Sequence, residues 1–116
     1  MEETININTK GQVTIDYDFI KNYKYNKRGN YFEMTGNINC DNLYIKEPIY
    51  LNGNIQVNDC IFLGDNIIAD KKITINQISA ITSNSKPAYA SLFVTEEIIA
   101  NRLTLFNYVK IENRRK

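Results

Sequence analysis

The sequence predicts an all-β protein, a single-domain, three-sided parallel β-helix (solenoid) built from hexad repeats. Three observations predict this class. Two aliphatic columns recur in steps of six residues, their members are rich in β-branched side chains, and turn-forming residues such as Asn, Asp and Gly dominate the fourth position of the steps. A chain of 116 residues is the right size for one domain.

Residues 1–35 are expected to form an irregular N-terminal cap. Ile5/Ile7 and Val13/Ile15 alternate as short strands do, and Lys10-Gly11 would join them. A Tyr-, Lys- and Asn-rich stretch follows, in which residues 27–30 predict a turn. A cap is needed because an end rung exposes unpaired strand edges and apolar side chains.

Residues 36–111 are expected to form the hexad solenoid. The first column reads Leu43, Ile49, Ile55, Ile61, Ile67 and Ile73, and the second reads Ile45, Leu51, Val57, Leu63, Ala69 and Ile75. Side chains two positions apart in a strand share a face, so both columns point inward. This spacing does not fit a helix of 3.6 residues per turn, and strands of about three residues are too short for hairpins. Three hexads would complete a rung of about 18 residues.

The second half of the chain contains one interruption. The repeat breaks at residues 79–91, which predict a loop or bulge. It resumes at Leu92/Val94, Ile98/Ala100, Leu103/Leu105 and Val109/Ile111, and residues 112–116 form a basic tail. Two steps are five residues long instead of six, after Cys40 and after Ala100, and both predict a sharper corner with a small inward residue.

The stretch from Gly36 to Ile45 (GNINCDNLYI), echoed at residues 98–105, resembles the Gly-x-Ile-x-Ala-x-x-Val-x-Ile pattern of bactofilins. The resemblance covers roughly residues 36–111. Bactofilins are bacterial cytoskeletal proteins whose right-handed triangular β-helix polymerises end to end without nucleotide. The resemblance therefore implies a right-handed solenoid and a polymer-forming structural role. The Asn-rich corners, sparse glycines and aromatic outward residues of this chain depart from the family pattern.

We expect no catalytic machinery, no cofactor and no metal site. The sequence has no histidine, which the hexapeptide-repeat acyltransferases and γ-type carbonic anhydrases require as base or zinc ligand, and its glycines are too scattered for a phosphate-binding loop. Asp59, Asp65 and Asp70 fall at successive corners, which places them on different edges of a triangle. Cys40 and Cys60 fit no paired metal or redox spacing; buried thiols are favoured, and a disulfide stays open.

The outward positions between the two columns supply a candidate protein interface. With about 18 residues per rung, Tyr44 would lie beside Phe62 on one face, Tyr50 beside Ile68 on the second, and Gln56 beside Thr74 on the third. Contiguous exposed apolar patches commonly mark interfaces, so Tyr44, Tyr50, Phe62 and Ile68 are the predicted interface residues. The alternative is that the N-terminal segment or residues 79–91 cover one of these faces.

A basic cluster precedes the solenoid. Lys21, Lys24, Lys27 and Arg28 interleave with tyrosines, a mixture that could contact phosphates or an anionic membrane surface. Flanking acidic residues favour a solvated cap instead, and a net charge of +1 gives no general attraction for nucleic acid. No apolar run reaches the roughly 20 residues of a membrane span, and no secretory signal is visible, so a cytoplasmic location is expected.

These features predict a non-enzymatic structural or scaffold protein, bactofilin-like, that self-associates through the solenoid ends or through the Tyr44/Phe62 face. The alternative is a monomeric adaptor that docks one protein partner on that face. A third possibility is a nucleic-acid or anionic-membrane contact through residues 21–31. No small-molecule substrate is expected.

Overall fold

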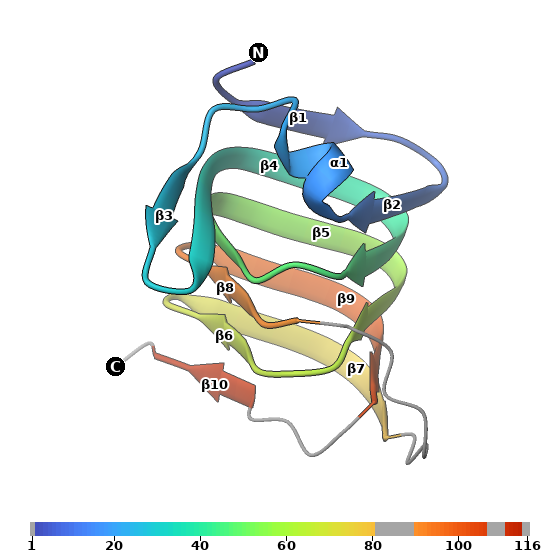
Figure 1. The fold of residues 1–116 in the computed structure, drawn as a ribbon. Helices are drawn as coiled ribbons and strands as arrows, with labels where there is room; N and C mark the ends of the chain where they lie inside the picture. The colour runs from blue at the N-terminus through green and yellow to red at the C-terminus, as the bar shows by residue number, and fades with distance from the viewer. Residues whose placement is uncertain (1, 81–89, 107–110, 115–116) are drawn as a thin grey trace.

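The computed structural model describes residues 2–80, 90–106 and 111–114 (Figure 1). Strands hold 70% of the described residues and helix 4%, which confirms the all-β class. Nearly all strand pairs are parallel, as predicted; among the described strands the one antiparallel pair joins β3 to β4. Within the described residues the sheet is not closed.

The described elements are ten strands and one short helix. They are β1 (Ile5–Asn8), β2 (Gln12–Ile15), α1 (Tyr17–Ile20), β3 (Asn26–Arg28), β4 (Tyr31–Ile45), β5 (Ile49–Leu63), β6 (Ile67–Ala69), β7 (Lys72–Ala80), β8 (Leu92–Val94), β9 (Glu97–Leu105) and β10 (Ile111–Asn113). The predicted strands at Ile5/Ile7 and Val13/Ile15 are therefore present.

The two longest strands, β4 and β5, curve through the centre of the molecule and pair with each other along most of their length (Figure 1). In the first halves of these strands Gly36 and Gly53 pair with each other and have φ angles of 145° and 156°. A side chain at either position would overlap the backbone of the neighbouring strand, so only glycine fits there.

The strands lie in stacked levels. A level is a set of strands at the same position along the stack, which pair with strands of the level before and the level after. In spatial order the levels are β1 with β2, then β4, then β5, then β8 with β9, then β6 with β7, and last β10 beside β6. The levels do not follow chain order, because β8 and β9 lie between β5 and the pair β6 and β7. The prediction that successive rungs stack in sequence order is wrong at this point.

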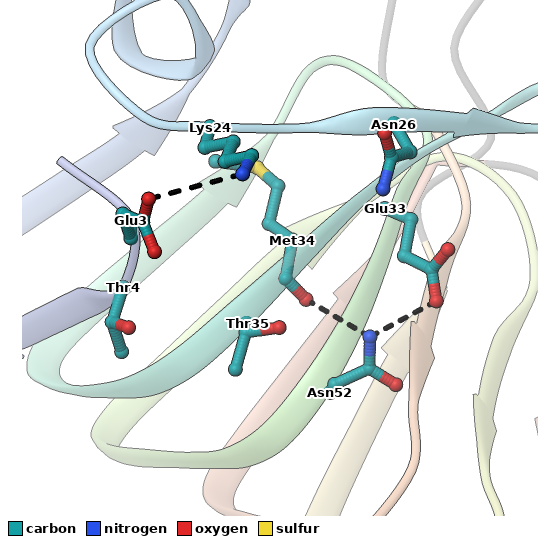
Figure 2. A pocket seen from close by; sticks show the side chains of 8 residues that line it. All are labelled: Glu3, Thr4, Lys24, Asn26, Glu33, Met34, Thr35 and Asn52. Carbon is teal, nitrogen blue, oxygen red and sulfur yellow. Dashed lines mark hydrogen bonds and ion pairs between the residues drawn. The ribbon is translucent and has the colours of Figure 1, made fainter. Parts of the chain in front are cut away.

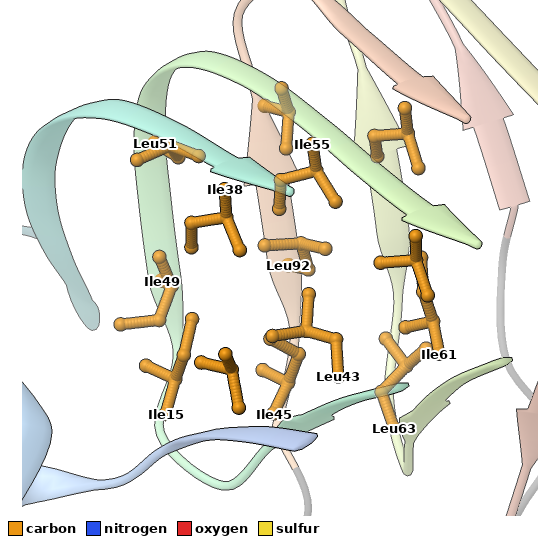
Figure 3. Packing of buried hydrophobic residues seen from close by; sticks show 14 of the residues in the cluster. Ile15, Ile38, Leu43, Ile45, Ile49, Leu51, Ile55, Ile61, Leu63 and Leu92 are labelled. Carbon is orange, nitrogen blue, oxygen red and sulfur yellow. The ribbon is translucent and has the colours of Figure 1, made fainter. Parts of the chain in front are cut away.

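The two aliphatic columns form the core, as predicted (Figure 3). Every member from Leu43 to Ala69 is at most 2% exposed. Ile73 and Ile75 are only half-buried, because β7 lies at the end of the stack. Full burial of an aliphatic side chain contributes about 1.5–3 kcal/mol, so these columns are the main source of stability.

The five-residue steps are visible as shifts in strand register. Between Cys40 and Asn42, β4 has one residue where β5 has two, and β5 has the same extra residue opposite β9 between Val57 and Cys60. The residue pairs on either side of each shift stay aligned. The extra residue therefore belongs to β5, and the shorter steps in β4 and β9 match each other across it.

The N-terminal cap is more regular than predicted. Asp16 caps α1 by accepting a hydrogen bond from the backbone N–H of Phe19 at 2.9 Å, and Ile20 at the end of α1 is fully buried against the core. The predicted turn narrows to Gly29 and Asn30, where Gly29 has a φ of 59° and joins β3 to β4. Since β4 begins at Tyr31, the stacked region starts before residue 36.

Two predicted segments are only partly described. In the predicted loop at 79–91, Ser79 and Ala80 belong to β7, and residues 81–89 lie outside the described residues. In the predicted tail at 112–116, Glu112 and Asn113 belong to β10, and residues 115–116 lie outside the description, as does Val109.

Candidate functional site

The most prominent side-chain arrangement is an aromatic pair on the face formed by β5, β8, β6 and β10. Tyr50 and Phe93 stack with ring centroids 4.4 Å apart and an interplanar angle of 5°. They stack because they are direct partners in the parallel pair of β5 and β8, where paired residues lie about one strand spacing apart. Ile68 follows Phe93 on β6.

Two arginines from opposite ends of the stack lie over this pair. The guanidinium carbon of Arg28, on β3, is 4.4 Å from the ring centroid of Tyr50, and that of Arg114, after β10, is 5.0 Å from the ring centroid of Phe93. Tyr31 adds an edge-on contact to Tyr50 at 6.3 Å. Each cation–π contact at such an exposed site contributes about 0.5–1 kcal/mol. We call this set, Arg28, Tyr31, Tyr50, Phe93 and Arg114, the aromatic–arginine groove.

The groove encloses about 590 Å³, and Ile68, Asp70 and the turn at Gly29 and Asn30 complete its lining. This volume falls within the range of ordinary ligand pockets, about 300–1,000 Å³. Phe93 and Ile68 form an apolar floor and are only 6% and 7% exposed. The groove can therefore receive a flat apolar group that carries polar atoms at its rim.

The charges around the groove are balanced. Arg28 lies 3.7 Å from Glu33 and Arg114 lies 3.2 Å from Glu112, while Asp70 lines the groove itself. Two cations face three carboxylates, so a simple anion would gain little electrostatic free energy by binding here. A partner that offers both apolar surface and mixed hydrogen-bonding groups fits better, and protein side chains have this character.

The predicted interface residues fall on two faces. Tyr44 and Phe62 stack as predicted, with centroids 4.3 Å apart and an interplanar angle of 7°. The predicted contact of Tyr50 with Ile68 is wrong, because Phe93 of the inserted level lies between them. Gln56 and Thr74 are likewise separated by Ile99, which is 40% exposed. Ile68 itself is almost buried and offers little surface to a partner.

The predicted basic cluster is largely neutralised. Lys21 pairs with Asp18 at 3.1 Å and Lys24 with Glu3 at 3.8 Å. Lys27 lies over the ring of Phe32 at 4.0 Å. Arg28, already paired with Glu33, belongs to the groove. The four side chains therefore do not form one positive surface.

A second, polar cleft of about 390 Å³ lies where the N-terminal segment meets β4 and β5 (Figure 2). Its lining residues are Glu3, Thr4, Lys24, Asn26, Glu33, Met34, Thr35 and Asn52. The side-chain amide of Asn52 donates to Glu33 at 3.0 Å and to the carbonyl oxygen of Met34 at 3.4 Å. Glu3 also pairs with Lys24, so the polar side chains that line the cleft bind one another.

The sequence pointed to Tyr50 as an interface residue and to Arg28 and Tyr31 as part of the basic stretch, but it did not predict Phe93 or Arg114 as site residues. One signal was available for Phe93, which stands between the inward residues Leu92 and Val94 in the resumed repeat and so occupies the outward column. Nothing comparable marks Arg114, whose position over Phe93 depends on where β10 pairs.

The fold and the groove define an all-β protein with a mostly parallel sheet and a mixed aromatic and charged surface site. Comparisons with known proteins found no matching family model, no similar curated protein and no similar solved structure. Within the described ranges, no helix is both long and apolar enough to cross a membrane. The same ranges contain no group of three or more Cys, Asp or Glu side chains placed to hold a metal ion.

Proposed function

We propose that the chain is a non-enzymatic scaffold protein, bactofilin-like, whose stacked levels are the rungs of a three-sided β-helix and which self-associates through one end of the stack. The single observation that carries this proposal is the pairing of β7. Among the described strands only β9 pairs with it, so no described strand pairs with its other edge. A nine-residue edge of this kind is a template for pairing with another chain.

The side chains at this end support the proposal. Ile78 is 54% exposed and Ile111 is 39% exposed, while Ile73 and Ile75 are half-buried. Ile73, Ile75 and Ile78 are inward positions of β7 and Ile111 is on β10, and no described strand pairs with the outer edge of either strand. A second copy placed there would remove this apolar surface from water.

The opposite end is closed by the chain itself. The helix α1 and the following residues cover the core there, with Ile20 fully buried and Tyr23 8% exposed. The hydrogen bond from the backbone N–H of Glu2 to the carbonyl of Asn22 at 3.0 Å and that from Lys24 to Glu2 at 2.7 Å tie the segment down. Assembly is therefore expected at the β7 end.

The test is the mass of the purified protein across a concentration series, measured by light scattering. We expect oligomers whose mass rises with concentration, and we expect Ile78→Lys to reduce them, because a lysine on an edge strand opposes pairing. Gln56→Lys is the matched control, since Gln56 is exposed in the middle of the stack. A wild-type protein that stays monomeric at every concentration would rule out self-association.

A second candidate function is a monomeric adaptor, and the aromatic–arginine groove is the observation that favours it. The variants Arg28→Ala and Arg114→Ala would each uncover one ring of the stacked pair. If the groove binds a protein partner, a partner found by affinity capture should lose affinity for both variants but keep it for Lys46→Ala, a change on an exposed lysine outside the groove. Equal capture by all three variants would exclude the groove.

A further inference from the structure

The level formed by β8 and β9 is held on both sides. β8 pairs with β5 and with β6, and β9 pairs with β5 and with β7. Its inward side chains are buried: Leu92, Val94, Ile98 and Leu103 are all 0% exposed. A segment that comes late in the chain thus lies inside the stack.

The two levels on either side of it are already in register with each other. Ile98 pairs with Ile55 on one side and with Ile73 on the other, and Phe93 pairs in the same way with Tyr50 and Ile68. Without β8 and β9, the pair β6 and β7 could therefore dock directly on β5. Ile67 would then meet Ile49 and Ile73 would meet Ile55, so aliphatic side chains would still stack on aliphatic ones.

Burial explains why the observed order is preferred in the complete molecule. Three apolar residues of the inserted level, Val94, Ile99 and Leu105, pair with smaller or more polar residues of the end level, Ala69, Thr74 and Ala80. Only Ala100, which pairs with Ile75, reverses this difference. The level with more aliphatic surface occupies the interior, and the more polar one forms the end.

Chain order favours the other arrangement during folding. Only residues 64–66 separate β5 from β6, whereas residues 64–91 separate β5 from β8. Contacts between nearby segments form faster than contacts between distant ones, because a short loop costs less entropy to close. While β6 and β7 are docked on β5, β8 and β9 cannot enter the stack of their own chain, and their insertion waits until that contact reopens.

We propose that β8 and β9 exchange between two copies of this chain, each inserting into the space between β5 and the β6–β7 level of the other. Every contact of the exchanged level is identical to one already present within a single chain, which is the condition for domain swapping. This inference rests on the proposed self-association and specifies one route to it. The route requires the ladders on both sides of the level to be open, so exchange occurs during folding and not between folded molecules.

The test uses a disulfide that reports which chain supplies β9. Gln56 and Ile99 are direct partners on neighbouring parallel strands, both are exposed, and their Cα atoms lie about 4.8 Å apart, within disulfide range. The natural Cys40 and Cys60 are buried. The variant Gln56→Cys/Ile99→Cys is unfolded under reducing conditions, refolded at a series of protein concentrations, oxidised and separated on a non-reducing gel.

We expect covalent dimers to increase at least severalfold from the lowest to the highest refolding concentration, and to stay at background when folded samples are concentrated without unfolding. The single variant Ile99→Cys measures random cross-linking. A second pair, Gln56→Cys/Thr74→Cys, spans two strand spacings, about 9.6 Å, which is too far for a disulfide unless β7 has docked directly on β5.

The outcomes separate this inference from the proposed function. Concentration-dependent dimers above the single-cysteine background support exchange. If the 56–99 disulfide forms only within one chain at every refolding concentration, exchange is overturned, and oligomers seen by light scattering would then be assigned to the outer edge of β7. If no oligomer forms at all, both fall together.

Discussion

The guanidinium of Arg102 donates two hydrogen bonds to the carboxylate of Asp59, at 2.8 and 3.0 Å, across 43 positions of the sequence. Asp59 is one of the two residues of β5 between Val57 and Cys60, where β9 has only one residue. Arg102 follows that residue and pairs with Cys60. The ion pair therefore joins β5 to the inserted level at the register shift. Both side chains are close to half exposed, so its contribution to stability is small.

The Asp59–Arg102 pair predicts a small pH dependence. The hydrogen bond from Arg102 lowers the pKa of the Asp59 carboxyl in the folded protein. Stability from this group is thus present above the carboxyl's unfolded pKa, about 3.9, and is lost as the pH falls through the lower folded value. We expect Asp59→Asn to lower the melting temperature by about 2 °C or less at pH 7. The difference should vanish near pH 2, and a larger gap at pH 2 than at pH 7 would contradict this account.

A charge in the inward column should unfold the protein. Ile61 is 0% exposed, and Ile61→Asp would bury a carboxylate that has no partner, at a cost of several kcal/mol, comparable to the whole stability of a small domain at about 5–15 kcal/mol. Circular dichroism should show loss of the β signal. The control is Gln56→Asp, which adds the same charge at an exposed position of the same strand. Equal tolerance of both changes would contradict the inward assignment.

The close approach of the backbone at Gly36 and Gly53 should require glycine. At Gly53 a methyl group would overlap the carbonyl oxygen of Gly36, and the φ of 156° is one that other residues rarely adopt. We expect Gly53→Ala to cost about 3 kcal/mol or more, measured by urea denaturation. Gly11→Ala is the matched control, because nothing lies within 4 Å of the added methyl group, and its free energy of unfolding should change by less than about 0.5 kcal/mol.

The Cys40 thiol should be unreactive in the folded protein. Burial, aided by the negative charge of Asp41, raises its pKa from 9.0 to about 11. A thiol reagent at pH 8 should label Cys40 only after denaturation. Because the folded pKa is the higher one, this group's contribution to stability is complete below about pH 9 and falls as the pH rises toward 11. Cys40→Ala should remove that part of the alkaline decline in unfolding free energy.

Much of the fold could be predicted because one physical pattern repeats. The alternation of Leu43 with Ile45, and of each later pair, specifies strand and inward face together, and the burial of these residues confirms the inward face. The five-residue step after Cys40 was informative for the same reason, since a missing residue in one strand must be matched by a bulge in its neighbour.

The order of the levels could not be predicted from that pattern, and the reason is the pattern itself. When every level presents the same aliphatic columns, Ile73 can stack on Ile55 as well as on Ile98, and periodicity gives no preference. The order depends on a difference in total burial between β7 and β9, which concerns the composition of whole strands. The groove was missed for the same reason, because Phe93 reaches Tyr50 only through the inserted level.

The inserted level also has a mechanical consequence. A stack whose levels follow chain order can be peeled from its end one strand at a time, each step breaking a single ladder. Here a force on the C-terminus first detaches β10 from β6 and then meets β9 and β8, which are held by ladders on both edges. These strands must slide out between two neighbours before β7 and β6 come under load. When the C-terminus is pulled, two ladders must therefore break together, and the molecule does not open one ladder at a time.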